Sequence, residues 1–571
     1  MSEQFDMLIR GGTVVDGTGA PGYAADVAIR DARVAAIGED LDGTATEEID
    51  ATGRVVCPGF VDIHTHYDAQ AMWDNRFTCS PWHGVTTAIV GNCGFGIAPM
   101  RPENRNTAMR TLEKVEGMSF EALSAGLGEQ WPFVTFPEYL DALESGGTAI
   151  NVAALVGHTP LRLWVMGADS TERTANEAEV AEMADLAREA VQAGAIGFST
   201  SVAATHHGHG GKPVPSRLAD FDEVDALVGA VSGEGARFLQ AAMGRGLFNE
   251  EFEDLARRHD ITITWTALLA GMTGKGKHHG YLETAAAQQA DGLRIVPQVA
   301  CRPIMFDFRF DEPYPFELLD CFGEVRNADR AAKAEAYADP AFRERFRAES
   351  APDAKNVNAG WAKRALVSRH DPDPSIEERG LEELAAERGV DPEDLALDLA
   401  LESDLTTRFR FAFLNHDQEE VRDLIQDPHT VITLSDAGAH ADQLCDACWS
   451  THLLGHWVRD EGALPLEAAV HALTQRPAEL VGLADRGVLA EGRPADVVVF
   501  DPETVGHKPL RRVADLPGGA ERLLADPVGV DAVIVNGTML RDSEGDRIPE
   551  GGDLPGRLLR GGTARHANGA G

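Results

Sequence analysis

The sequence predicts an α/β fold in which a (β/α)8 TIM barrel carries a small β-sandwich domain formed by both chain termini. Three observations support this prediction. Short apolar runs alternate with longer Ala-, Leu- and Glu-rich segments through the central part of the chain, a pattern typical of βα units. Short alternating runs with glycine turns fill the first fifty-odd residues and return near the other end. Polar or reactive residues follow most of the central runs.

The two terminal regions have the same β character. Residues 6–19, 25–38 and 47–59 read as short strands between glycine turns, and residues 492–505 and 531–542 repeat the pattern. Because chain ends often lie close together, one domain built from both regions is the economical interpretation. We therefore expect residues 1–56 and 488–562 to form a composite β-sandwich, residues 57–487 to form the barrel, and residues 563–571 to be a flexible tail.

The central region contains eight candidate barrel strands. They lie at residues 55–64, 86–94, 150–158, 195–201, 236–242, 261–268, 294–300 and 430–438. Eight parallel strands, each followed by a helix, make a closed barrel whose chemistry gathers at the carboxyl ends of the strands. The interval 301–429 is long for one connection and contains helix-like stretches, so we expect a helical insertion over the barrel mouth.

Composition and charge indicate which classes of binding partner are not expected. The chain has 571 residues, 43% of them apolar, and its 51 basic against 92 acidic residues give a formal charge of −41. This charge repels nucleic acid and anionic lipid surfaces, so neither is expected as a partner. No basic and apolar leader and no run near the roughly 18 apolar residues of a membrane span is evident, so we expect a cytoplasmic protein. The sequence does not decide whether the protein is a monomer or a homo-oligomer.

His64 and His66 stand at the end of the first barrel run. Side chains on an extended strand alternate faces, so the two imidazoles project from one face with Thr65 on the other. Two adjacent imidazoles suggest a metal ion, whereas the plainer interpretation is a pair of surface or hydrogen-bonded core histidines. The motif alone does not decide between these interpretations.

Several motifs together resemble a known family. They are PGFVDIHTHYD (58–68), GNCGFGIAP (91–99), EGM (116–118), VGHTPLR (156–162), GAIGFSTS (194–201), LSDAGAH (434–440) and PADVVVFDP (494–502). From about residue 6 to 562 the chain resembles the amidohydrolase superfamily, and within it the D-aminoacylase-like N-acyl-D-amino-acid deacylases. The resemblance implies a (β/α)8 barrel with a β-sandwich from both termini. It also implies hydrolysis of a small-molecule amide by zinc-activated water.

The resemblance also implies a ligand set. Its HxH pair falls on His64 and His66, its strand-two thiolate on Cys93, and its strand-eight carboxylate on Asp436. The histidines that family members carry on strands five and six are absent here. Gln240 and Ala241 occupy the first region, and Thr266 and Ala267 occupy the second. The chain therefore looks like a less characterised branch, for which one zinc ion is expected and a second lacks its ligands.

Loop histidines are candidates to replace the missing ligands. They lie after the fourth and sixth runs, at His206, His207 and His209 and at His278 and His279. The glycine-rich loop after the fourth run has the character of a segment that closes over a substrate, so His206 is also a candidate substrate-binding residue.

Three further residues have candidate roles in catalysis. Asp436 is the candidate general acid and base, because a carboxylate beside a metal ion can carry a proton from water to the leaving nitrogen. His158 either polarises the substrate carbonyl or is a core histidine satisfied by the backbone. Arg162 either holds a substrate carboxylate or forms a salt bridge on the barrel rim.

The sequence thus favours a metal-dependent hydrolase of carbon–nitrogen bonds other than peptide bonds. The expected substrate is an N-acyl (D-)amino acid or a related amide. One alternative is a single-metal hydrolase of a cyclic amide or imide. Another is a binding protein that keeps the fold without catalysis, which would be stabilised by its ligand without turning it over.

Overall fold

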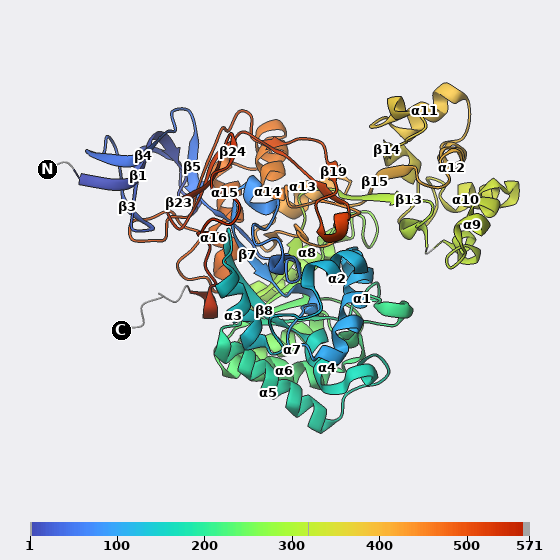
Figure 1. Cartoon of the computed structure of the whole chain (residues 1–571), viewed down its shortest axis with the longest axis horizontal. Helices are drawn as coiled ribbons and strands as arrows, with labels where there is room; N and C mark the ends of the chain where they lie inside the picture. Colours follow the sequence, from blue (N-terminus) through green and yellow to red (C-terminus); the bar gives the residue numbers. More distant parts are fainter. Residues whose placement is uncertain (1–2, 318, 564–571) are drawn as a thin grey trace.

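The computed structural model describes residues 3–317 and 319–563. Figure 1 shows a β domain built from the blue and red ends of the chain, a central barrel, and a separate lobe in yellow tones. Residues 564–571 of the expected tail lie outside the described residues. In the described part of the chain, no helix is both long and apolar enough to cross a membrane.

The barrel contains eight parallel strands that follow one another around the sheet in chain order. They are β6 (Phe60–Asp62), β7 (Val85–Val90), β8 (Asn151–Gly157), β9 (Gly197–Ser201), β10 (Phe238–Ala242), β11 (Thr262–Thr266), β12 (Ile295–Val299) and β16 (Val431–Ile432). The first and last strands meet where Thr65 bridges Ala437 in parallel and the His66 amide donates to the Ala437 carbonyl at 2.8 Å. The predicted barrel, with an additional β domain, is confirmed.

Helices cover the outside of the barrel. Helix α5 (Glu177–Ala193) illustrates why they form, because Asn176 and Glu179 make a capping box at its start and Gly194 follows its end. Its buried residues recur with helical spacing and face the barrel. The other helices are α1 (Arg105–Glu116), α2 (Phe120–Leu127), α3 (Phe136–Gly146), α4 (His158–Met166), α6 (Phe221–Gly233), α7 (Asn249–His259), α8 (His278–Ala290), α13 (Gln418–Gln426), α14 (Trp449–His452), α15 (Leu466–Leu473) and α16 (Gln475–Leu480).

The β domain joins the two ends of the chain in one sheet. Strand β17 (Val497–Phe500) pairs antiparallel with β5 (Val55–Pro58) from the N-terminal region and with β22 (Val530–Val535) from the C-terminal region. Apolar side chains from both regions share one buried cluster. The other strands of this sheet are β1 (Glu3–Val14), β2 (Tyr23–Arg30), β3 (Arg33–Gly38), β4 (Gly43–Asp50), β23 (Thr538–Asp542) and β24 (Gly545–Asp546).

The insertion differs from the purely helical segment that the sequence predicted. Besides α9 (Arg330–Ala338), α10 (Pro340–Glu349), α11 (Leu381–Arg388) and α12 (Pro392–Glu402), it contains a three-stranded antiparallel sheet. The strands are β13 (Ile304–Arg309), β14 (Ala365–Arg369) and β15 (Arg408–Leu414). Phenylalanine rings dominate a core of its own. The lobe meets the barrel where the Asp307 amide donates to the Gln443 carbonyl at 2.7 Å.

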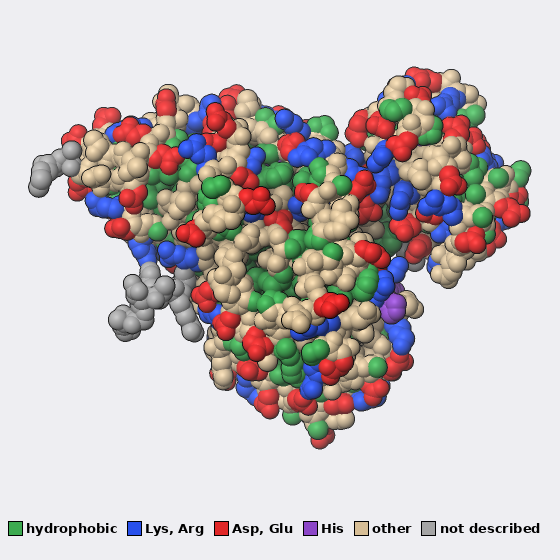
Figure 2. Space-filling model, viewed as in Figure 1, with side chains coloured by type: hydrophobic (Ala, Val, Ile, Leu, Met, Phe, Trp, Pro, Cys, Tyr) green, Lys and Arg blue, Asp and Glu red, His purple; other side chains and the backbone are tan. Residues whose placement is uncertain are grey.

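Charged side chains cover the visible surface without gathering by sign. Figure 2 shows acidic side chains scattered over all three parts of this face, with basic ones among them. The negative charge is therefore distributed and does not form one large acidic patch on the side shown.

His83 links the barrel to the C-terminal region and should make stability depend on pH. Its ring bonds the Thr451 hydroxyl at 2.9 Å and the Ala525 carbonyl at 3.0 Å. Burial lowers the pKa of His83 from 6.5 to about 3. Between these values the unfolded chain binds more protons, so stability falls as pH drops, by up to about 1.4 kcal/mol per pH unit.

We therefore expect His83→Gln to show a shallower decline of melting temperature between pH 6.5 and 4.5 than the wild type does. Differential scanning fluorimetry across this range measures the slope. His209→Gln, at an exposed position, is the control and should keep the wild-type slope. Equal slopes for His83→Gln and the wild type would contradict the prediction.

Candidate metal centre

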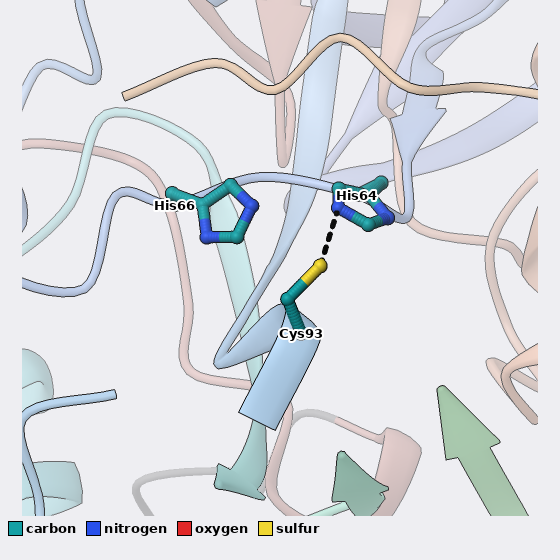
Figure 3. Close-up of side chains that lie close together, drawn as sticks. All are labelled: His64, His66 and Cys93. Carbon is teal, nitrogen blue, oxygen red and sulfur yellow. Dashed lines mark hydrogen bonds between the residues drawn. The ribbon is translucent and has the colours of Figure 1, made fainter. Parts of the chain in front are cut away.

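Two histidines and one cysteine converge at the rim of the barrel. His64 and His66 follow β6, and Cys93 lies in a short helical turn after β7. Figure 3 shows the three side chains approaching one another from these two segments. Their donor atoms all lie within 4.8 Å of one another, and the Cys93 Sγ is 3.5 Å from the His64 Nε2. The carboxyl ends of strands one and two therefore meet as the sequence predicted.

Asp436 brings a carboxylate to the same place from strand eight. Its Oδ1 is 3.2 Å from the His64 Nε2 and 3.8 Å from the His66 Nε2. Its side chain is 29% exposed, whereas those of His64 and His66 are 1% and 7% exposed. The backbone of Asp436 is left-handed, with φ 44°, and so turns the chain directly after the strand. Asp436 is thus the solvent-facing member of the four.

Gln298 fixes the tautomer of His64. The Gln298 Nε2 donates to the Thr264 hydroxyl at 2.9 Å, so its Oε1 faces the His64 Nδ1 at 2.6 Å and accepts from it. The proton of the neutral imidazole therefore lies on Nδ1, and the lone pair of Nε2 points toward Cys93 and Asp436. Holding the second ring nitrogen in this way is how proteins orient metal-ligating histidines.

Glu116 occupies the corresponding place beside His66. Its Oε1 lies 3.3 Å from the His66 Nδ1 and has no hydrogen-bond partner in the described part of the chain, although the side chain is only 7% exposed. Burial, with the neighbouring Asp436 and Asp68, raises the pKa of Glu116 well above its usual value. Burial, with His64, His440 and His206, lowers the pKa of His66 well below 6.5. His66 is therefore neutral, the form that binds metal ions.

The chemistry of the donors fits a divalent cation. Burial, followed by the charges of Asp436 and Glu116, raises the pKa of the Cys93 thiol well above its usual value. A thiol in this setting ionises when a cation binds beside it. Two imidazoles, a thiolate and a carboxylate are ligands typical of zinc. His64, His66, Cys93 and Asp436 are the residues that would hold it.

Strands five and six supply polar side chains where the family's histidines were expected. The Gln240 Oε1 accepts from the Cys93 amide at 2.5 Å, and its buried Nε2 has no partner within residues 3–317 and 319–563. Thr266 ends β11 and is close enough to lower the pKa of Cys93 by a hydrogen bond. These strands therefore support Cys93 and provide no imidazole to a second ion.

The loop histidines lie in different surroundings and do not gather at the cluster of His64, His66 and Cys93. The His206 ring packs 5.2 Å from the Phe95 ring, and its Nδ1 bonds the Ser201 hydroxyl at 2.6 Å. Burial lowers the pKa of His206 to about 3, so the ring is neutral beside the site. His207 and His209 are exposed. His278 and His279 form a separate group with Asp423.

His158 and Arg162 both lie on α4 and bind the same buried carboxylate, that of Glu223. The His158 Nδ1 bonds the Thr200 hydroxyl and its Nε2 bonds the Glu223 Oε1, both at 2.8 Å. The Arg162 Nη1 donates to both Glu223 oxygens, at 2.6 and 2.5 Å. Both side chains are 0% exposed. The structure does not bring them to the cluster, so we leave the expected catalytic His158 and substrate-binding Arg162 out of the proposed site.

A narrow cleft of about 20 Å³ opens beside His66. Its polar side consists of His66, Asp68 and Glu116, and its apolar side consists of Phe95, Leu112, Met118 and Leu123. Burial raises the pKa of Asp68 to about 7. The cleft therefore joins an apolar surface to the candidate ligands, with room for about one water molecule.

Sequence reasoning assigned no role to Glu116 or Gln298. Glu116 begins the motif EGM (116–118), and Gln298 is a polar residue inside an apolar strand. A glutamine that interrupts a fully buried strand is the signal that could have indicated a partner for His64.

A parallel barrel with buried imidazole, thiol and carboxylate donors at its rim is an arrangement typical of metalloenzymes. The chain belongs to the amidohydrolase family, whose Amidohydro_3 model matches residues 47–540. It is 30% identical to a D-aminoacylase of Alcaligenes xylosoxydans xylosoxydans, over 94% of each chain. It is also 30% identical to an N-acyl-D-glutamate deacylase of that organism, over 98% of this chain and 97% of the relative.

Solved structures of a deacylase and an aminoacylase are also similar to this chain. One is an N-acyl-D-glutamate deacylase from Bordetella bronchiseptica, complexed with zinc and a phosphonate mimic of the tetrahedral intermediate. It is 28% identical, with a TM-score of 0.66, and 98% of this chain and 100% of that chain are covered. Another is a D-aminoacylase whose binuclear metal centre is activated by one metal and attenuated by a second. It is also 28% identical, with a TM-score of 0.66, over 97% and 99% of the two chains.

Gln298 offers a test of how the ligands are held. We expect Gln298→Leu to weaken zinc binding by about 10- to 100-fold, because His64 loses the partner that fixes its tautomer. Competition with a chromophoric chelator measures this affinity. Gln192→Leu, on an exposed pair with Glu234, is the control and should bind zinc as the wild type does. Unchanged affinity in Gln298→Leu would contradict the orienting role.

Proposed function

We propose that the protein is a metal-dependent amidohydrolase that cleaves the amide bond of an N-acyl amino acid, most favourably of the D configuration. One zinc ion would be held by His64, His66, Cys93 and Asp436. The observation that carries the proposal is the convergence of these donors, with the donor atoms of His64, His66 and Cys93 within 4.8 Å of one another and Asp436 beside them. Family membership and the deacylase relatives support it.

The residues divide the chemistry among them. A bound zinc ion supplies Lewis acidity, which polarises the scissile carbonyl and lowers the pKa of water. Asp436, the more exposed carboxylate, takes a proton at a carboxylate oxygen and passes it to the leaving nitrogen. Gln298 keeps the His64 lone pair directed at the site. His206 lies neutral beside Phe95 and can hydrogen-bond a substrate through the Nε2 that Ser201 leaves free.

The apolar side chains beside His66 suggest where the acyl group lies. Phe95, Leu112, Met118 and Leu123 form an apolar wall next to the candidate ligands. An acyl chain packed against this wall would have to widen the narrow cleft, and its carbonyl would then lie toward His66. Its apolar surface would gain roughly 25 cal/mol for each Å² removed from water.

Metal removal and substrate screening test the function together. Chelation with dipicolinate should abolish hydrolysis of N-acetyl-D-amino acids, and one equivalent of zinc should restore it. A panel of N-acyl-D-, N-acyl-L- and cyclic amides, followed by amine release or ring opening, should show turnover concentrated on the acyclic D compounds. Metal-dependent turnover of cyclic amides alone would replace the proposed substrate. Ligand-induced stabilisation without any turnover would reject an enzymatic role.

A further inference from the structure

A second group of side chains that could hold a metal ion lies away from the proposed catalytic ligands. His278 and His279 form the first turn of α8, and Asp423 lies on α13. The Asp423 Oδ2 is 3.2 Å from the His278 Nε2 and 3.8 Å from the His279 Nε2. One donor atom from each of the three residues lies within 4.8 Å of the others. The two histidine rings are 4.0 Å apart at 39°.

The two ring nitrogens of His278 lie near two different carboxylates. Its side chain is 3% exposed, and its buried Nδ1 has no hydrogen-bond partner among the residues that the structure describes; it lies 3.8 Å from the Glu420 Oε2. Its Nε2 already faces Asp423. A cation bound at Nε2 would keep the ring proton on Nδ1, where it points toward Glu420.

Glu420 is held firmly in the supporting position. Its Oε2 accepts from the Gly271 amide at 3.0 Å, and its Oε1 accepts from the Gly276 amide at 2.6 Å. Glu420 and Asp423 are three residues apart on α13 and so share one face of that helix. Glu420 is therefore fixed near the Nδ1 of the buried His278 ring, and Asp423 lies near its Nε2.

We propose that His278, His279 and Asp423 bind a divalent transition-metal ion, with Glu420 orienting His278. Two imidazoles and one carboxylate favour zinc over calcium or magnesium, which prefer oxygen ligands. The side chains of His279 and Asp423 are 61% and 47% exposed, which leaves room for water to complete the coordination. This ion would fasten the start of α8 to α13. Its role is structural, because none of its ligands belongs to the catalytic set.

Anomalous scattering at the zinc edge tests the proposal on crystals of the full chain grown with zinc. We expect a peak bounded by His278, His279 and Asp423, separate from any peak at His64. The exposed double variant His279→Ala/Asp423→Ala should lose this peak. His209→Ala, which removes an exposed histidine outside the group, should keep it. No peak in the wild type, or a peak that survives the double variant, would overturn the proposal.

Zinc stoichiometry gives an independent measure in solution. Equilibrium dialysis followed by elemental analysis should find one zinc equivalent per chain fewer in the double variant than in the wild type and in His209→Ala. Equal zinc content would mean that the residues form only an ion pair, and the proposal would fall. A His64→Ala chain that still binds zinc at His278 and His279 would support the site even if the catalytic proposal failed.

Discussion

Hydrolysis should be lost when His64 is replaced by alanine. We expect kcat/KM to fall by at least about 1000-fold, since the loss of a single oxyanion donor already costs roughly 100- to 1000-fold in other hydrolases. The His64 Nε2 lies 3.5 Å from the Cys93 Sγ and 3.2 Å from the Asp436 Oδ1, so removing the ring opens the centre of the ligand set. Bound zinc should fall in parallel with activity.

The measurement combines steady-state kinetics with elemental analysis of the purified protein, and circular dichroism checks the fold. His209→Ala should keep wild-type activity, because its side chain is exposed and lies outside the ligand set. Asp436→Asn should lose turnover by a larger factor than it loses zinc, because the amide keeps an oxygen donor but cannot carry the proton. Full activity in His64→Ala would require the hydrolytic proposal to be abandoned.

The largest effect on stability should come from Glu223→Ala. Its carboxylate binds Arg162 and His158, and all three side chains are at most 1% exposed. Burial raises the pKa of Glu223, but the His158 hydrogen bond and the His158 and Arg162 charges outweigh burial and lower it overall. The carboxylate is therefore ionised and balances Arg162. Removing it leaves a buried cation unpaired, which costs about 3–5 kcal/mol in free energy of unfolding.

Urea unfolding followed by tryptophan fluorescence measures this loss. Lys212→Ala is the matched control, because it breaks a pair with Glu172 in which the side chains are 57% and 55% exposed. Exposed pairs of this kind contribute at most about 1 kcal/mol. A Glu223→Ala chain as stable as Lys212→Ala would show that Arg162 finds another partner.

The barrel and the convergence of the candidate ligands could be predicted because both follow from local patterns. Each strand appears in the sequence as a short apolar run, and parallel strands in a barrel place their carboxyl ends on one rim. His64, Cys93 and Asp436 each stand directly after such a run, so their proximity needs no knowledge of loop conformation. The family resemblance supplied their roles.

The buried partners could not be predicted because they are set by contacts between distant segments. Nothing in VGHTPLR shows that Glu223, on another helix, takes up both His158 and Arg162. Glu116 reaches His66 from a helix after strand two, and Gln298 reaches His64 from strand seven. Arg and Phe alternate in β15, a pattern typical of a strand. The helical stretches around it led to the prediction of a helical insertion instead.

The sheet shared by the two chain ends affects how the protein is made in the cell. β5 leaves the ribosome more than 400 residues before its neighbour β17, an interval of roughly 20 to 90 s at 5–20 residues per second. During that time one edge of β5 remains unpaired and open to association with other chains. Newly made protein should therefore need chaperone protection until translation is nearly finished, and truncation near residue 490 should yield aggregates.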